Sequence, residues 1–138
     1  MKILVATDGS QAADKAVDVA LKRARLTGDQ LVIANVSEVF CPVGVTELDP
    51  TVFEEASRKE SAAIIAAALA RAKAAGIEAQ TIQESGAPAD TLISIAKREG
   101  VGEIFIASHG RHGLARVAMG SVSARVVEWA PCTVTVVK

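Results

Sequence analysis

The sequence has few aromatic residues, two cysteines and almost no net charge, and each of these shortages narrows what the protein can be. Only 3% of its 138 residues are aromatic, although 50% are hydrophobic, mainly Ala, Val and Ile. Small and β-branched apolar residues suit helices that pack closely on a parallel sheet. The formal net charge of −1 provides no strongly basic face, so we expect the protein not to bind nucleic acid.

Long hydrophobic runs and a secretion signal are also missing. Asp8 interrupts the first apolar stretch too early for a signal peptide, and no uninterrupted apolar run approaches the ~20 residues that span a membrane. Cys41 and Cys132 are far apart and form no CxxC pair, which favours free thiols over a disulfide or a metal site. We therefore expect a cytoplasmic protein that does not bind membranes.

Several signatures of nucleotide enzymes and metal sites are absent. The chain contains no GxxxxGK[ST] P-loop, and Gly100-Val-Gly102 precedes a strand-like stretch instead of opening a helix, so no dinucleotide fingerprint is supported. His109 and His112 have no third ligand or carboxylate near them in the sequence. We interpret both as polar loop residues and assign no catalytic and no metal-binding residues.

The chain does contain an alternation of strand-like and helix-like segments. Apolar or β-branched stretches predict strands over 2–7, 31–36, 77–84, 103–107 and 132–137, and helical spacing predicts helices over 13–24, 50–75, 89–99 and 121–130. This order predicts a single α/β domain over residues 1–138. We expect a doubly wound, Rossmann-like, five-stranded parallel sheet with four helices on its two faces.

A stretch rich in glycine and serine follows the fourth predicted strand. Gly110 and Gly113 lie in the loop, and Gly120 and Ser121 open the last helix. Glycine lets the main chain approach a ligand closely, and a helix start offers unpaired amides and the positive end of the helix dipole. We interpret the stretch as a phosphate site, the alternative being a surface loop followed by an ordinary capped helix.

Four segments together resemble the universal stress protein family over the whole chain: 5–10, 108–113, 120–123 and 130–134. The resemblance implies an adenine-nucleotide-binding α/β domain that is usually dimeric. ATP-binding members carry a glycine, two residues, a second glycine, nine residues and then Gly-Ser or Gly-Thr. Gly110, Gly120 and Ser121 match this pattern, whereas Ala107 stands where the first glycine is expected.

The resemblance also implies roles for individual residues. Asp8 would accept hydrogen bonds from ribose hydroxyls, although as a residue type it could equally cap the first helix. The backbone of Val36 would meet the adenine edge, and Arg111 is either a phosphate contact or a solvated charge. Phosphates would be held by Gly110, Gly120, Ser121 and Ser123. The complete predicted nucleotide site is Ala6, Thr7, Asp8, Val36, Ile106, Ala107, Gly110, Arg111, Gly113, Gly120, Ser121, Val122 and Ser123.

Ala107 is the one departure from the nucleotide-binding pattern. We expect its methyl group to face the path of the ribose and phosphates, where glycine would leave more room. Ala107→Gly is accordingly predicted to tighten ATP binding and to lower the stability of the unliganded protein slightly.

These observations lead us to expect a stress-response or regulatory protein that binds ATP with Mg²⁺ and has no dedicated chemical step. One alternative is a dimeric interaction scaffold that binds no nucleotide. The other is an ATPase, whose turnover would be slow because no convincing general base accompanies the phosphate loop. A homodimer through the closing strand, residues 133–137, is expected because an apolar edge strand needs to be covered. Trp129 is expected in the core or at an interface.

Overall fold

The computed structural model describes residues 1–38, 49–110 and 119–138. Its elements are, in chain order, β1 (Lys2–Ala6), α1 (Gln11–Thr27), β2 (Gln30–Ser37), α2 (Pro50–Ala74), β3 (Ala79–Ser85), α3 (Pro88–Glu99), β4 (Glu103–Ala107), α4 (Ser121–Trp129) and β5 (Thr133–Val137). The predicted alternation of strands and helices is confirmed. Most of the segment between β2 and α2, which loses periodicity in the sequence and is predicted to be a loop, lies outside the described residues.

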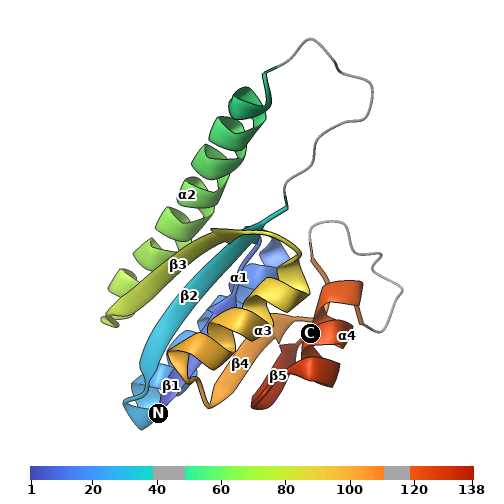
Figure 1. Ribbon diagram of the computed structural model, residues 1–138. Coiled ribbons are helices and arrows are strands. Elements are labelled where there is room, and N and C mark those ends of the chain that lie inside the picture. The colour runs from blue at the N-terminus through green and yellow to red at the C-terminus, as the bar shows by residue number, and fades with distance from the viewer. Residues whose placement is uncertain (39–48, 111–118) are drawn as a thin grey trace.

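The five strands form one parallel sheet in the order β3-β2-β1-β4-β5 (Figure 1). The central strand β1 pairs with β2 on one side and with β4 on the other, so the winding of the chain reverses between β1 and β4. In such sheets the residues that follow the two central strands meet at the carboxyl edge, where ligands bind. The predicted doubly wound fold is confirmed, and this edge is where a site is expected.

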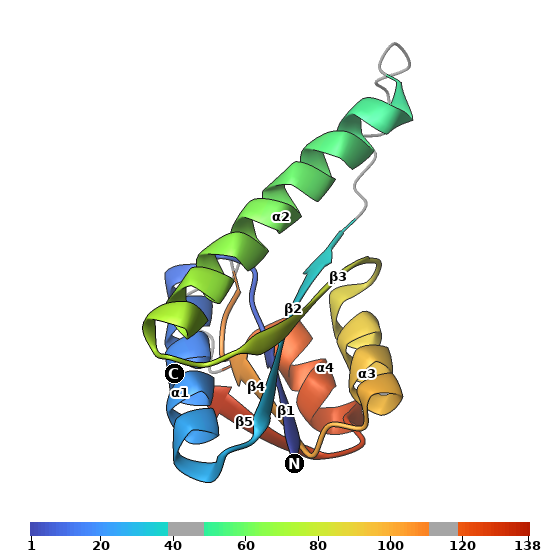
Figure 2. The same cartoon turned by 90° about the vertical axis from the view of Figure 1, so that its left-hand side faces the viewer.

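Helices cover both faces of the sheet, α1 and α2 on one and α3 and α4 on the other (Figure 2). Successive strand residues point to opposite faces, so Ile3 and Val5 of β1 join the core beneath α1 and α2, whereas Leu4 joins the other core. Strands buried on both faces need apolar residues at every position, as the continuous run in β1 shows.

Local signals in the sequence explain where the helices begin and end. Helix α1 ends at Gly28, which takes the left-handed conformation (φ 75°) that glycine adopts without strain. Helix α2 begins at Asp49, whose carboxylate accepts a hydrogen bond from the Thr51 amide at 3.0 Å. That hydrogen bond lowers the pKa of Asp49 below its ordinary value. In the sequence, a glycine after helical spacing predicts a helix end at Gly28, and an aspartate before a proline predicts a helix start at Asp49, so both boundaries are confirmed.

Helix α2 extends beyond the sheet that it covers. Its buried residues begin only at Ser61, and the half that precedes Ser61 projects past the carboxyl edge of the sheet in both views (Figures 1 and 2). The packed half contributes Ile65, Ala68 and Ala72 to the core beneath α1 and α2. The first buried turn of α2, at Ser61, therefore lies near the carboxyl edge of the sheet.

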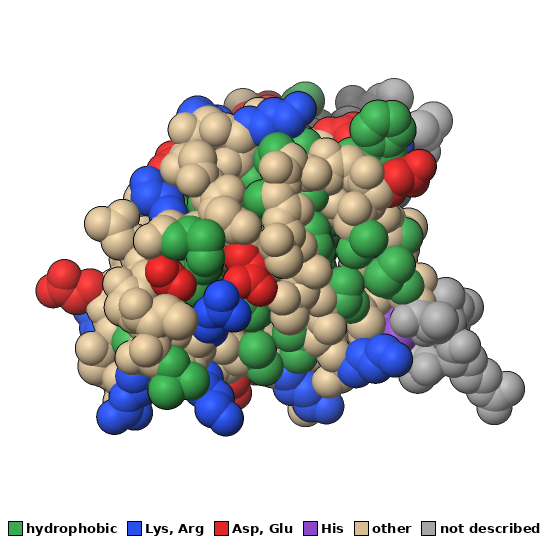
Figure 3. All heavy atoms as spheres, turned by 90° about the horizontal axis from the view of Figure 1, so that it is seen from below, with side chains coloured by type: hydrophobic (Ala, Val, Ile, Leu, Met, Phe, Trp, Pro, Cys, Tyr) green, Lys and Arg blue, Asp and Glu red, His purple; other side chains and the backbone are tan. Residues whose placement is uncertain are grey.

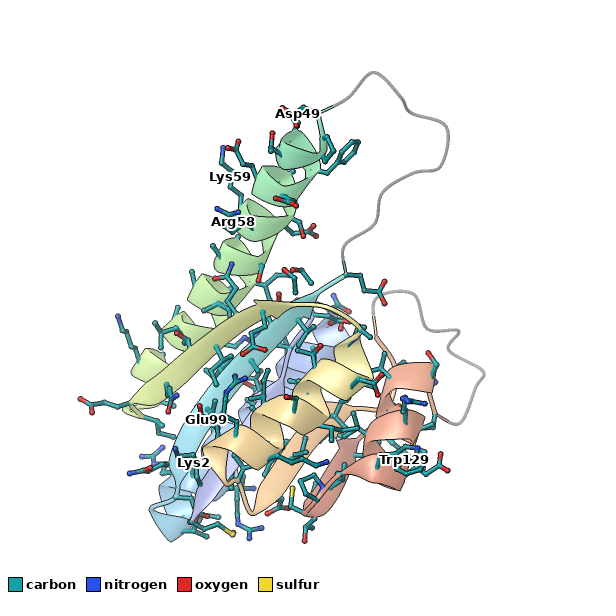
Figure 4. The ribbon with its side chains drawn as sticks, viewed as in Figure 1. Lys2, Asp49, Arg58, Lys59, Glu99 and Trp129 are labelled. Atoms are coloured by element: carbon teal, nitrogen blue, oxygen red, sulfur yellow. The ribbon has the colours of Figure 1, made fainter. Side chains whose placement is uncertain are left out.

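Two side chains of α4 are exposed. The helical spacing of Ser123, Val126, Val127 and Ala130 predicts Val127 on the inner side of the helix, and this prediction is wrong because Val127 is 44% exposed. Trp129 is 60% exposed and points outward, so of its two expected places the core is excluded and an interface stays a prediction (Figure 4). Helix α4 packs on the margin of the sheet against α3 and β5. Its inner strip is consequently narrow, and Ser123 and Val126 are its buried residues.

The surface carries both signs of charge. Seen from the amino-terminal ends of the strands, acidic and basic side chains are interspersed with hydrophobic ones (Figure 3). Among the described helices, none combines the length and apolar character that crossing a membrane requires.

Candidate functional site

The turn after β1 is organised by hydrogen bonds that backbone amides donate to short polar side chains. The Oδ1 atom of Asp8 accepts from the Ser10 amide at 2.9 Å, and the Ser10 hydroxyl accepts from the Ala13 amide at 3.1 Å. The N-cap of α1 is therefore Ser10, and the alternative that Asp8 caps the helix is wrong. Asp8 shapes the turn that precedes the helix, as aspartate often does.

Gly9 in this turn has little room for a side chain. Its φ of 81° lies in the left-handed region, and a methyl group added to it would come within 2.9 Å of the Cγ1 atom of Ile64 on α2. The Gly9 amide donates to the Thr7 hydroxyl at 3.2 Å. Backbone conformation and close packing thus both require glycine at this position.

The segment after β4 is closed onto the start of α4. The buried residue Ser108 continues the sheet, because its amide donates to the Val137 carbonyl at 2.9 Å. The Ser108 carbonyl accepts from the Gly120 amide at 2.6 Å and from the Ser123 hydroxyl at 3.0 Å. The Ser108 hydroxyl also lies 3.0 Å from Nδ1 of His109. Ser108 thereby fixes where the first turn of α4 lies relative to β4.

The turns after β1 and β4 meet at Asp8 and Gly110. A methyl group placed on Gly110 would lie 2.9 Å from the Oδ2 atom of Asp8. Gly110 is not among the glycines with positive φ, so it is required for space and not for an unusual backbone conformation. The Asp8 carboxylate and the Gly110 backbone are therefore close neighbours at the carboxyl edge of the sheet.

Gly120 is also a glycine that makes room. It is the N-cap of α4 with an extended backbone (φ −72°, ψ 164°), and a methyl group there would lie 3.2 Å from the Ser108 carbonyl oxygen. No side chain among the described residues caps this helix start. The first turn of an α-helix offers backbone amides that have no partner within the helix, and the exposed Ser121 lies at this helix start.

The remaining predicted site residues differ in how accessible they are. Ala6, Val36 and Val122 are partly buried and pack against the core beneath α3 and α4, whereas Thr7 is buried. Ile106 is also buried. Arg111 and Gly113 lie outside the described residues.

Ser123 and Ala107 are placed differently from what the sequence suggested. The Ser123 residue is 3% exposed, and its hydroxyl contacts the carbonyl oxygens of Ser108 and Gly120 at 3.0 Å each. Ala107 is 7% exposed and belongs to the core beneath α1 and α2. The expectation that the Ala107 methyl faces the phosphate path is therefore wrong, because alternation along β4 turns this side chain into the core.

Sequence reasoning missed three buried polar residues beneath the site: Asn35, Ser61 and Ser108. The Asn35 amide donates to the Thr7 carbonyl at 2.7 Å and accepts from the Ser61 hydroxyl at 2.5 Å. The signal was present, because an asparagine inside an otherwise apolar strand is unfavourable unless its side chain has a specific partner.

Other features of the described residues lie apart from this edge. Lys2 and Glu99 pair at 3.2 Å near the opposite ends of the strands, and the Lys2 hydrogen bond lowers the pKa of Glu99 (Figure 4). Burial raises the pKa of the free Cys132 thiol. The described residues contain no cluster of three or more His, Cys, Asp or Glu side chains that could hold a metal ion.

An open groove between α1 and α2 shares no residue with the predicted site. Arg71 in this groove pairs with Asp14 at 3.1 Å and with Asp18 at 2.9 Å, and its hydrogen bond to Asp18 raises the pKa of Arg71. These exposed ion pairs connect two helices and contribute little to stability. The carboxyl edge is therefore the stronger candidate.

Comparison with known proteins agrees with the fold. The sequence model of the universal stress protein family matches residues 1–138. The universal stress protein YxiE of Bacillus subtilis is 32% identical over 145 residues, covering 99% of this chain and 98% of the relative.

Solved structures give the same result. The universal stress protein UspA from Lactobacillus plantarum is 29% identical with a TM-score of 0.88, covering 100% of this chain and 97% of the other. A universal stress protein solved in complex with cAMP is 28% identical with a TM-score of 0.77, again covering 100% and 97%.

Proposed function

Since the chain belongs to the universal stress protein family, we propose that it binds an adenine nucleotide at the carboxyl edge of its sheet and acts as a stress-response or regulatory protein. The observation that carries this proposal is the approach of Gly110 to Asp8, where a methyl group would lie 2.9 Å from the carboxylate. A similar structure bound to cAMP supports an adenine nucleotide as the ligand.

Each part of the edge supplies one kind of contact. The Asp8 carboxylate accepts hydrogen bonds from ribose hydroxyls, and the Val36 backbone meets the adenine edge. The first-turn amides of α4 and the exposed Ser121 hydroxyl hold phosphate, as uncapped helix starts do. The backbones of Ala107 and Gly110 line the same path, while Ser123 holds the first turn of α4 in place.

ATP with Mg²⁺ is the nucleotide that we propose. Mg²⁺ is bound in proteins chiefly through nucleotide phosphates and a few carboxylates, so a dedicated cluster of protein ligands is not required. The residues at this edge bind and orient the nucleotide, and the proposed role requires no chemical step. A cytoplasmic location suits the free thiol of Cys132, since disulfides are rare in that compartment.

We also propose that the protein is a homodimer in which β5 pairs with its copy. Strand β5 is the last strand of the sheet and pairs with β4 on its other side. Neighbouring α4 exposes Val127 and Trp129, so apolar surface adjoins the open strand edge. Pairing about a two-fold axis covers both edges at once.

Calorimetric titration of the wild type, Asp8→Asn and Asp18→Asn with ATP and Mg²⁺ tests nucleotide binding. We expect Asp8→Asn to weaken binding about tenfold, because a hydrogen bond to a charged acceptor contributes roughly 1.5–3 kcal/mol. Asp18→Asn, an exposed acid on α1, should bind as the wild type does. GTP serves as the base-specificity control.

Thermal unfolding provides the second readout. A nucleotide at 100 times its Kd should add about 2.7 kcal/mol to the stability of the folded protein. If millimolar ATP produces no heat and no stabilisation, the proposal is contradicted. That result would favour a dimeric scaffold that binds no nucleotide.

A further inference from the structure

A chain of hydrogen bonds runs through the interior beneath the proposed nucleotide site. The Ser61 hydroxyl on α2 donates to the Asn35 Oδ1 atom at 2.5 Å, and the Asn35 Nδ2 group donates to the Thr7 carbonyl at 2.7 Å. Ser61 is 2% exposed, Asn35 4% and Thr7 5%. The chain of hydrogen bonds therefore connects α2, β2 and the end of β1 through three buried residues.

Packing alone does not account for Asn35. The residues on either side of it in β2, Ala34 and Val36, are apolar, and an apolar residue at position 35 would bury itself without needing a partner. A buried side-chain amide is unfavourable unless it is hydrogen-bonded. The presence of Asn35 therefore indicates that the groups it binds have to be held in place. The partner on the β1 side is the Thr7 carbonyl.

The Thr7 carbonyl belongs to the peptide group that leads into Asp8. Strand β1 ends at Ala6, and the Thr7 amide still pairs with the Ala34 carbonyl at 2.9 Å. Asn35 holds the next carbonyl with its side chain, which extends the pairing by one group beyond the strand. Because a peptide group is planar, fixing the Thr7 carbonyl also fixes the direction in which the chain enters Asp8.

Helix α2 reaches the same turn at a second point. Ile64, one turn after Ser61, lies against Gly9, where an added methyl group would come within 2.9 Å of its Cγ1 atom. The turn of Thr7, Asp8 and Gly9 is thus held from below by Asn35 and from the side by α2. Opposite this turn lies Gly110, which leaves space for the Asp8 carboxylate.

We propose that Asn35 and Ser61 are positioning residues for nucleotide binding, which hold the Thr7–Asp8 turn so that the Asp8 carboxylate faces the ribose. This role rests on the proposed function. Neither side chain touches the nucleotide, because both are buried beneath the turn. They act through the Thr7 carbonyl and the direction that it gives to Asp8.

The test measures selectivity for ribose as well as affinity. ATP, 2′-deoxy-ATP and 3′-deoxy-ATP are titrated into the wild type, Asn35→Asp and Ser61→Ala. Asn35→Asp keeps the shape of the side chain but replaces the amide donor by an oxygen opposite the Thr7 carbonyl. Its added charge acts equally on the three triphosphates, so the ratio of their affinities reports only on ribose contacts.

We expect the wild type to prefer ATP about tenfold over at least one deoxy analogue, as the loss of a hydrogen bond to a carboxylate implies. Asn35→Asp should reduce this preference to nearly one, as should Asp8→Asn. Ser61→Ala should reduce the logarithm of the ATP preference by about half. In this variant Asn35 keeps its hydrogen bond to the Thr7 carbonyl but loses the one from the Ser61 hydroxyl. If Asn35→Asp does not fold, Ser61→Ala decides the question.

Thr135→Val is the matched control. It removes a partly buried hydrogen bond of 2.6 Å to Glu103, close to the amino-terminal end of β4, and should leave affinity and ribose preference unchanged. The inference would be overturned, with nucleotide binding left intact, if Ser61→Ala and Asn35→Asp showed the same preference for ATP over its deoxy analogues as Thr135→Val. A wild type that binds the three nucleotides equally would also overturn it, and one that binds none would remove the proposed function as well.

Discussion

At the scale of single residues, the glycines of the site differ in why they are glycine. Gly9 has a left-handed backbone and a close neighbour, whereas Gly110 and Gly120 have no positive φ and are confined by atoms of Asp8 and Ser108. A glycine that is needed only for space can be replaced without backbone strain. Substitution at Gly110 can therefore separate binding from folding.

Gly110→Ala should weaken ATP binding about tenfold while changing the stability of the unliganded protein by at most about 1 kcal/mol, because the backbone is not strained and only the end of one side chain has to move. The methyl group would displace the Asp8 carboxylate, which Ser10 holds on its other side. Calorimetric titration and urea unfolding of the same preparations give the two quantities. Unchanged affinity would show that the nucleotide does not lie between Asp8 and Gly110.

Ala107→Gly is the companion variant, and the structure reverses what the sequence suggested for it. Its methyl group lies in the core, so glycine there removes packing and adds roughly 0.5–1 kcal/mol of backbone entropy cost without freeing space for a ligand. We expect lower stability and unchanged ATP affinity. Tighter binding by this variant would restore the original expectation.

At the scale of elements, residues with one strong local role were predicted correctly. Asp49 before Pro50 and Gly28 after α1 mark helix boundaries through capping, which depends on few neighbours. The sequence around Asp8 and Ser10 offers two capping residues, and only the position of the chain after β1 decides that Ser10 takes the role. Exposure of Val127 and Trp129 depends on where α4 packs, which helical spacing does not specify.

Strand β5 is the strand through which we propose that two copies of the chain pair. Val136→Lys should shift the protein from dimer to monomer in sedimentation at micromolar concentration, because a lysine at the open edge opposes pairing of two copies. Trp129→Ser should weaken the same association without touching the strand, and Leu26→Lys, 76% exposed on α1, should have no effect. A wild type that is monomeric throughout, or variants that remain dimeric, would contradict pairing through β5.

At the scale of the whole molecule, the fold brings two distant segments together. Asp8 and Gly110 are adjacent because β1 and β4 are paired neighbours where the winding reverses. The strand pattern predicted that edge, and the resemblance to the family indicated which residues meet there. The chain from Ser61 through Asn35 to Thr7 could not be predicted, because it depends on how α2 lies across β2.

Mapping where ATP binds tests the central claim most directly. Amide resonances of ¹⁵N-labelled protein are followed during titration with ATP and Mg²⁺. We predict that the shifts concentrate at Asp8, Gly110 and the first turn of α4, while Gly102, at the other end of β4, stays unperturbed. Shifts centred on the groove between α1 and α2, or none at millimolar ATP, would contradict a nucleotide site at the carboxyl edge.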